Sequence, residues 1–220
     1  MKKLFAFNLA EILITMSIIG VVAALVIPPL FGTFEDRMNS VQMKKTYGEI
    51  DAAISRYMAL KKTDNLSSVS DNAELNNFVN NFFNIAVDCG TASVPNTEAD
   101  AVCFAKNYRN IKGMPTPISR KATCSKVVML KSDVSLCIDL PEEDDNFALR
   151  FEIDITGKNL PNISGKDLFT VFVYPSGELY DPRFDIEGEC KLSEYDAKTG
   201  SGLLGKLIST GWNLDYSGCD

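Results

Sequence analysis

Residues 1–30 read MKKLFAFNLAEILITMSIIGVVAALVIPPL, and this stretch decides the architecture of the chain. Lys2 and Lys3 come first, Glu11 follows, and no charged residue occurs from Ile12 to Leu30. At about 1.5 Å of rise per residue, a helix of this length spans nearly all of the hydrocarbon core of a membrane. The sequence therefore predicts an apolar N-terminal helix with one carboxylate at its head.

Glu11 is the unusual residue of this run. A carboxylate at bilayer depth costs on the order of 2.5–3.5 kcal/mol, so such residues are usually paired and functional. A cleaved secretory signal is one alternative, for which Val22-Ala23-Ala24 is a weak cleavage site, and an uncleaved signal anchor is another. Neither needs a glutamate at this place. In a third alternative, Glu11 merely extends its carboxylate to the membrane surface.

The segment from Ala6 to Leu13, AFNLAEIL, resembles the processing motif of type IV prepilins and type II secretion pseudopilins. In that family a short basic leader ends in a small residue, a Phe opens the mature chain, and a Glu stands four positions later. The leader here ends in Ala6 rather than the usual Gly. The resemblance implies cleavage between Ala6 and Phe7, methylation of the Phe7 amine, and pairing of Glu11 with the Phe7 amine of a neighbouring subunit.

The resemblance divides the chain into a leader at 1–6, a transmembrane and filament-core helix at 7–30, and an exported globular domain at 31–220. Pro28 and Pro29 are expected to kink the helix, because proline lacks an N–H and crowds the preceding turn. Apolar residues continue at three- and four-residue steps to about Leu60, which predicts one long bent helix. Its apolar face is expected to contain Phe34, Met38, Val41, Tyr47, Ile50, Ile54 and Tyr57.

The remaining patterns predict an α+β fold. A short helix is expected around Glu74 to Phe83, and the chain from Cys89 to Lys126 is read as loop-like. Segments 126–130 and 135–139 flank a short polar turn, which is typical of a hairpin, and two further strands are predicted at 147–155 and 169–174. A long helix packed on a small antiparallel sheet follows, which is also the general plan of pilins.

Six cysteines all follow the apolar segment: Cys89, Cys103, Cys124, Cys137, Cys190 and Cys219. An even count after an export signal predicts disulfides in an oxidising compartment. Neighbours in sequence are the default pairs, although a tight turn near Asp133 would not bring Cys124 directly opposite Cys137. The resemblance to type IV pilins implies that Cys190 and Cys219 close a surface loop. Fifteen connectivities remain open.

Composition argues against several function classes. The net charge is −7 and there is no basic stripe, which argues against intrinsic nucleic-acid binding. The chain has no histidine, so a catalytic triad has no base, and no C-x-x-C pair suggests zinc. We expect no enzyme and no metal or other cofactor. Calcium alone stays open, at the acidic run 142–145 or at 154–158, which resembles a segment near the calcium loop of certain pseudopilins.

The sequence thus predicts a non-enzymatic structural subunit of a type IV pilus or type II secretion-like filament. Its implied partners are other pilin subunits, a prepilin peptidase, an inner-membrane assembly platform and, before assembly, membrane lipid. It would cross the bacterial inner membrane once and then enter a periplasmic or extracellular filament. Adhesion, motility, secretion and DNA uptake all stay open. The alternative is a monomeric, signal-anchored exported protein whose outer domain binds a ligand.

Overall fold

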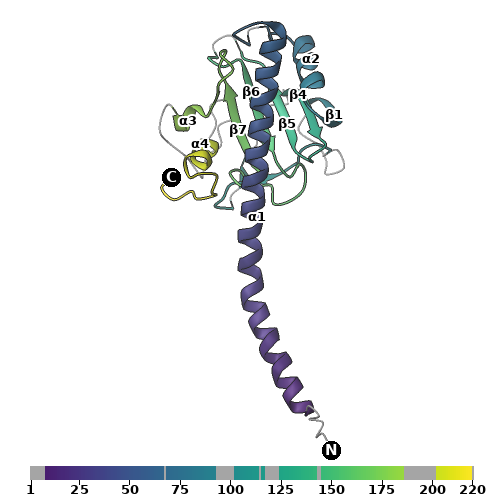
Figure 1. Ribbon diagram of the computed structural model, residues 1–220, viewed down its shortest axis with the longest axis vertical. Coiled ribbons are helices and arrows are strands. Elements are labelled where there is room, and N and C mark those ends of the chain that lie inside the picture. Colours follow the sequence, from purple (N-terminus) through teal and green to yellow (C-terminus); the bar gives the residue numbers. More distant parts are fainter. Residues whose placement is uncertain are drawn as a thin grey trace, which may run out of the picture. The chain divides into compact units, whose positions relative to one another are not determined.

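The computed structural model describes residues 8–66, 68–92, 102–113, 115–116, 124–142, 145–185 and 202–219 (Figure 1). The chain separates into two compact units, Met1–Met38 and Asn39–Asp220. It has an N-terminal apolar helix and an antiparallel sheet, which confirms the predicted α+β class.

Helix α1 runs from Leu9 to Lys61, over 53 residues. It is helical through Pro28 and Pro29, and the kink expected there stays a prediction. The helix ends because Lys62 adopts a left-handed backbone with φ of 53°. The N–H of Thr63 then donates to the carbonyl of Met58 at 3.1 Å, which satisfies one of the last carbonyls of the helix.

The predicted apolar face of α1 is confirmed in its later part, where Ile50, Ile54 and Tyr57 are buried and Tyr47 is partly buried against the core. It was wrong at Phe34, Met38 and Val41, which are 60%, 56% and 67% exposed. The buried face also contains Ser40, Met43, Thr46 and Ala53. Ser40 and Thr46 are polar, so apolar spacing alone could not find this part of the face. The Thr46 hydroxyl is satisfied because it donates to the carbonyl of Gln42 at 3.0 Å.

The main sheet has six strands in the order β1-β4-β5-β6-β7-β8, and each neighbouring pair is antiparallel. Its strands are β1 Ile85–Ala92, β4 Cys124–Leu130, β5 Ser135–Asp139, β6 Leu149–Asp154, β7 Leu168–Val173 and β8 Leu179–Tyr180. The predicted hairpin is β4 and β5, and the two other predicted strands are β6 and β7. A separate pair joins β2 Tyr108–Arg109 to β3 Pro115–Thr116.

Strand β1 lies at the start of the stretch that was read as loop-like, so that reading was wrong here. Its sequence, IAVDCGTA, contains a glycine and an aspartate, and its register against β4 shifts at three places. Such bulges break the two-residue alternation by which a strand is recognised in sequence. They also bend the strand and strengthen its twist.

Three shorter helices complete the fold. Helix α2, Asn72–Phe82, is close to the predicted helix and begins at Asp71, whose carboxylate accepts from the N–H groups of Ala73 and Glu74. The others are α3, Pro182–Asp185, and α4, Leu203–Ser209. These two approach closely at Gly205, where an added Cβ would lie 2.4 Å from the Cβ of Phe184.

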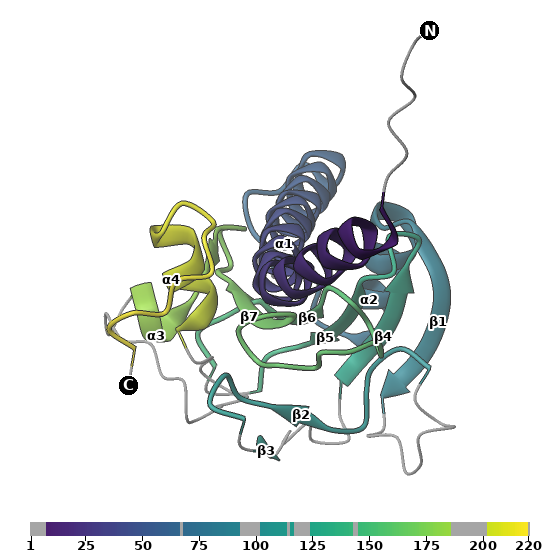
Figure 2. The same cartoon turned by 90° about the horizontal axis from the view of Figure 1, so that it is seen from below.

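Both faces of the sheet are covered. The Asn39–Lys61 part of α1 and helix α2 pack on one face, and the β2–β3 segment lies on the other (Figures 1 and 2). A second cluster there includes Phe104 and Tyr108, packed against β4, β5 and β7. Polar residues of β6 are therefore enclosed, and Glu152 and Asp154 are only 1% and 0% exposed. The Tyr108 hydroxyl donates to the Asp154 carboxylate.

The corrected face of α1 leads to a stability prediction. Ile50→Ala removes a fully buried side chain and should lower the free energy of unfolding by about 2–4 kcal/mol. The matched exposed change Val41→Ala should shift it by less than about 0.5 kcal/mol. Chemical denaturation of the full chain in detergent, followed by the fluorescence of Trp212, measures both. Equal losses at the two positions would contradict the observed burial.

Candidate functional site

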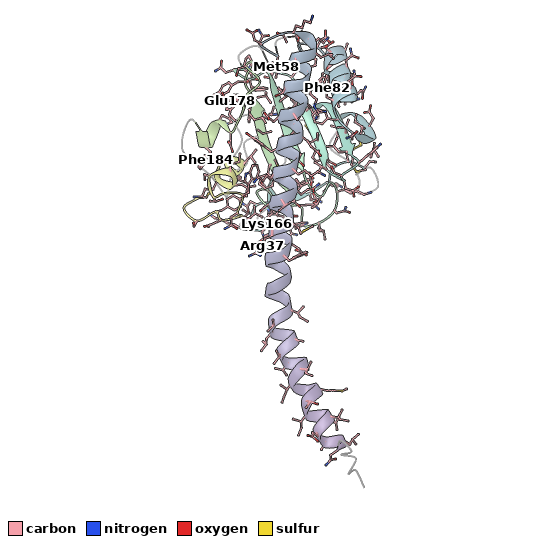
Figure 3. All side chains as sticks on the ribbon, viewed as in Figure 1. Arg37, Met58, Phe82, Lys166, Glu178 and Phe184 are labelled. Atoms are coloured by element: carbon pink, nitrogen blue, oxygen red, sulfur yellow. A yellow bond between two sulfur atoms is a disulfide. The ribbon has the colours of Figure 1, made fainter. Side chains whose placement is uncertain are left out.

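The candidate site is the first part of α1. From Leu9 to Ile27, 19 residues have a mean hydropathy of 2.5 and none is buried. It is the one helix among the described residues that is long and apolar enough to cross a membrane. Its side chains point outward around the helix (Figure 3), and Leu9 and Leu25 are 74% and 72% exposed.

The few polar groups in this segment are bound to the helix itself. The Thr15 hydroxyl donates to the carbonyl of Ile12 at 2.9 Å, and the Ser17 hydroxyl donates to that of Leu13 at 2.8 Å. Such local hydrogen bonds let serine and threonine lie in an apolar environment without an unsatisfied donor. The surface of the segment is therefore apolar apart from its head.

Glu11 stands in the first turn of the helix, where a carboxylate is favoured by the positive end of the helix dipole. Its own N–H donates to the carbonyl of Asn8 at 3.0 Å. Among the described residues, no donor or cation pairs with the Glu11 carboxylate. The predicted processing residues, Ala6 and Phe7, lie outside the described residues.

Phe34 and Met38 add two exposed apolar side chains to the first unit beyond this segment. They are interspersed with the charged residues Glu35, Asp36 and Arg37. Because this surface is not used for packing within the described part of its unit, it is available for contact with another molecule. The spacing of apolar residues predicted that Phe34 and Met38 lie on the packed face of the helix, whereas both are exposed.

Two disulfides join pairs of described cysteines in the second unit. Cys89 in β1 is bonded to Cys103, with Cα atoms 6.5 Å apart, and Cys124 is bonded to Cys137, with Cα atoms 5.6 Å apart. Both join neighbours in sequence, which is the default pairing. The β4–β5 ladder ends at Lys126 opposite Ile138, so Cys124 lies beyond the ladder and not directly opposite its partner, as expected.

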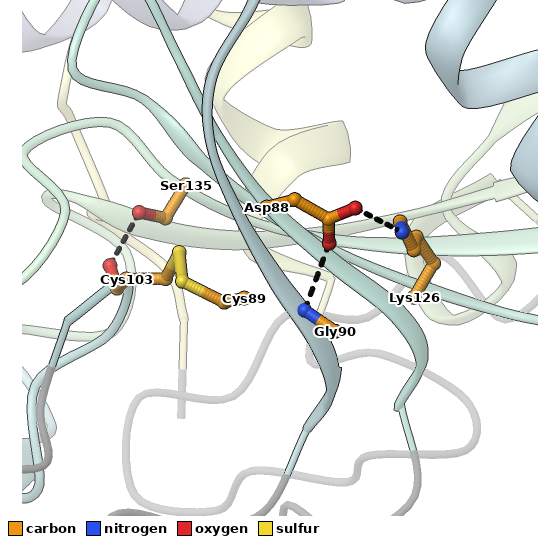
Figure 4. Close-up of a disulfide and its surroundings, with 6 residues drawn as sticks. All are labelled: Asp88, Cys89, Gly90, Cys103, Lys126 and Ser135. Carbon is orange, nitrogen blue, oxygen red and sulfur yellow. Dashed lines mark hydrogen bonds and ion pairs between the residues drawn. A yellow bond between two sulfur atoms is a disulfide. The ribbon is translucent and has the colours of Figure 1, made fainter.

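The surroundings of the first disulfide tie three segments together (Figure 4). Ser135 donates its hydroxyl to the carbonyl of Cys103, and Lys126 donates to the Asp88 carboxylate at 2.6 Å. The bond from Lys126, together with the N–H of Gly90, lowers the pKa of Asp88. The disulfide thus joins Cys103, in the segment that covers the sheet, to the edge strand β1. The ion pair between Asp88 and Lys126 joins β1 to β4.

Cys219 is also in a disulfide, and no described cysteine is free. Cys190, the partner that the resemblance implied, lies outside the described residues.

The described residues give calcium little support. One group has the spacing for a metal, Cys124, Cys137 and Asp139, but both thiols are consumed in a disulfide. In the predicted turn after β6, Asp154 accepts from Thr156 and Tyr108, so its oxygens are used within the protein. Glu143 and Asp144 of the acidic run 142–145 lie outside the described residues.

A second carboxylate, Asp167, holds the loop that follows this turn. It accepts from the N–H groups of Asn162 and Ile163, both at 2.6 Å, and from the Thr156 hydroxyl at 3.2 Å. Burial raises the pKa of Asp167, and these donors act against that rise. No local motif predicts the bond between Asp167 and Thr156, because 11 positions of the chain separate the two residues.

No known family, characterised protein or solved structure matches this chain.

The disulfides lead to a testable prediction. Peptide mapping of the native full chain without reductant should give linked peptides for Cys89–Cys103 and Cys124–Cys137, and no thiol that alkylates freely. Replacing Cys124 and Cys137 together by serine should lower the free energy of unfolding by about 3 kcal/mol, because each closed loop has roughly 15 residues. Linked peptides that join one pair to the other would contradict this connectivity.

Proposed function

We propose that this chain is a structural subunit of a filament of the type IV pilin or pseudopilin kind, and that it assembles through its N-terminal helix. The observation that carries the proposal is the exposed apolar segment Leu9–Ile27 with a carboxylate at its head that has no partner among the described residues. The resemblance of the motif around Ala6, Phe7 and Glu11 to the processing motif of that family supports the proposal.

The exposed segment cannot stay in water. Burying one large aliphatic side chain is worth about 1.5–3 kcal/mol, and most of the segment consists of such residues. A bilayer can cover it first, because its length fits the hydrocarbon core and its backbone groups are bonded within the helix. The helices of other subunits can cover it afterwards, so one surface serves the membrane pool and the filament.

Lipid tails are as apolar as leucine, so the hydrophobic effect alone does not drive helices together within a membrane. A polar contact must favour the assembled state, and Glu11 is the residue that can make it. Cleavage between Ala6 and Phe7 leaves a positively charged amine on Phe7. The amine of a neighbouring subunit can lie at the same depth in the membrane as the Glu11 carboxylate. Each charge then offsets the desolvation of the other, and the pair also fixes the axial register of the two helices.

The disulfide-bonded second unit supports export. Disulfides form and persist in oxidising compartments, and the described domain has two of them on one sheet. The proposal therefore places the second unit in the periplasm or outside the cell, with the N-terminal helix as a single membrane anchor before assembly. Exposed Phe34 and Met38 are candidates for further contact between subunits.

Processing gives the first test of the proposal. The protein isolated from bacterial membranes should begin at a methylated Phe7, as read by N-terminal sequencing and intact mass. Ala6→Leu should block cleavage without preventing membrane insertion, and Ala6→Gly is the matched control that should be cleaved normally. A mature chain that begins after Ala24, or one that keeps Met1, would contradict the proposal.

Glu11 gives the second test. Glu11→Ala leaves the amine of a neighbour unpaired, which typically costs about 3–5 kcal/mol at a buried site, so incorporation into filaments should fall more than about tenfold. Insertion of the monomer should be unchanged or better, because a carboxylate leaves the membrane. The measurement is the ratio of protein in sheared filaments to protein in the membrane pool.

The matched control is Asp51→Ala, which removes an exposed carboxylate from the later part of the same helix, away from Phe34 and Met38, and should leave this ratio unchanged. A monomeric signal-anchored protein, the competing function, predicts no sheared fraction for the wild type. An equal ratio for wild type and Glu11→Ala would mean that Glu11 does not direct assembly.

A further inference from the structure

A hollow of about 510 Å³ lies on the second unit, between the segment that contains β2 and the loop after β6. Three cationic side chains line it: Lys106, Arg109 and Lys158. Two amide side chains, Asn107 and Asn162, also line it, and apolar residues such as Leu160 and Pro161 form the rest of the wall.

The charge of this hollow is opposite to that of the whole chain. The net charge is −7, yet none of the described residues that line the hollow carries a carboxylate. Within the described part of the chain, none of the three cations forms an ion pair. Gathering like charges around a concave surface is unfavourable in itself, and it raises the local concentration of anions.

The backbone that carries these cations is held in place. Arg109 donates its N–H to the carbonyl of Asn162 at 2.9 Å, and its carbonyl accepts from the N–H of Ser164 at 2.8 Å. The Asp167 carboxylate anchors the same loop through the N–H groups of Asn162 and Ile163. The backbone of Arg109 and of residues 162–164 is therefore fixed before any ligand arrives, which lowers the entropic cost of binding at this side of the hollow.

Buried Asp154 and Asp167 belong to the same region and have to be considered as counterions. Their oxygens accept from the backbone, from Tyr108 and from Thr156, at hydrogen-bonding distance. No such bond joins either carboxylate to Lys106, Arg109 or Lys158 among the described residues. The three cations are therefore available to a ligand.

We propose that this hollow binds a phosphate group. Arg109 has the planar fork that binds two phosphate oxygens at once, and the two lysines add mobile point charges. The volume lies within the range of small-molecule sites and exceeds what a lone phosphate fills, so a phosphate ester with a small organic part fits. The phosphate can come from a free ester or from a lipid headgroup. This binding does not depend on filament assembly.

The test uses the full chain in zwitterionic detergent micelles at low salt, with amide chemical shifts as the readout. Inorganic phosphate is titrated in one arm, with sodium chloride of equal ionic strength as the reference. Micelles that contain phosphatidylglycerol, without free phosphate, form the other arm. We expect saturable shifts at Arg109, Asn162 and Ile163 in at least one arm.

The decisive variant is Lys106→Gln/Arg109→Gln/Lys158→Gln, which should weaken binding at least about tenfold. Lys112→Gln is the matched control, since Lys112 is an exposed lysine of the same segment that does not line the hollow. Amide shifts of the triple variant that match the wild type outside the hollow show that it is still folded. The single variant Lys158→Gln is a milder second check that lost binding does not come from lost folding.

Saturation by inorganic phosphate supports a free ester as ligand, and saturation with phosphatidylglycerol alone supports a headgroup. Absence of saturable shifts in both arms would overturn the proposal. So would binding that survives in the triple variant, or a response to chloride that equals the response to phosphate.

Discussion

The exposed segment Leu9–Ile27, whose 19 residues are mostly apolar and none of which is buried in the described structure, is strongly favoured to be covered by something other than water. A membrane covers it without any specific contact. A bundle of like helices covers it only if a polar interaction favours the bundle over lipid. Glu11 stands at the head of this segment, where such an interaction can form with the amine of a processed neighbour. The proposed function follows from these two requirements together.

The second unit differs from the first, because it buries its apolar residues in its own core. One face of the sheet is covered by the later part of α1 and by α2, and the other by the segment that Cys89–Cys103 fastens to the sheet (Figures 2 and 4). Covering both faces explains why β6 buries Glu152 and Asp154. These acidic residues need donors from the covering segment, and for Asp154 one of them is Tyr108. Because the domain is closed in this way, the contacts with other subunits that we propose lie on the first unit.

Regular patterns could be predicted from the sequence, and features that depend on distant partners could not. The apolar helix, the β4–β5 hairpin and strands β6 and β7 all have an uninterrupted apolar run or alternation. The first part of the buried face of α1 was predicted wrongly because Ser40 and Thr46 lie on it, whereas the apolar Val41 points to solvent. Strand β1 was missed because bulges interrupt its alternation. The cationic hollow could not be predicted, because Arg109 and Lys158 are far apart in sequence and line one hollow only in the folded domain, where Arg109 is bonded to residues 162–164.

The central claim is that Leu9–Ile27 packs against the same segment of other subunits in an open, head-to-tail series. Pairs of cysteines introduced along this segment and oxidised in whole cells test it most directly, because the native cysteines described here are all already bonded. A head-to-tail contact joins two different faces, so at least one pair should give a ladder of bands well beyond the dimer. If every pair gives monomers and dimers only, the helix is an anchor or a symmetric dimer contact, and the filament account is wrong.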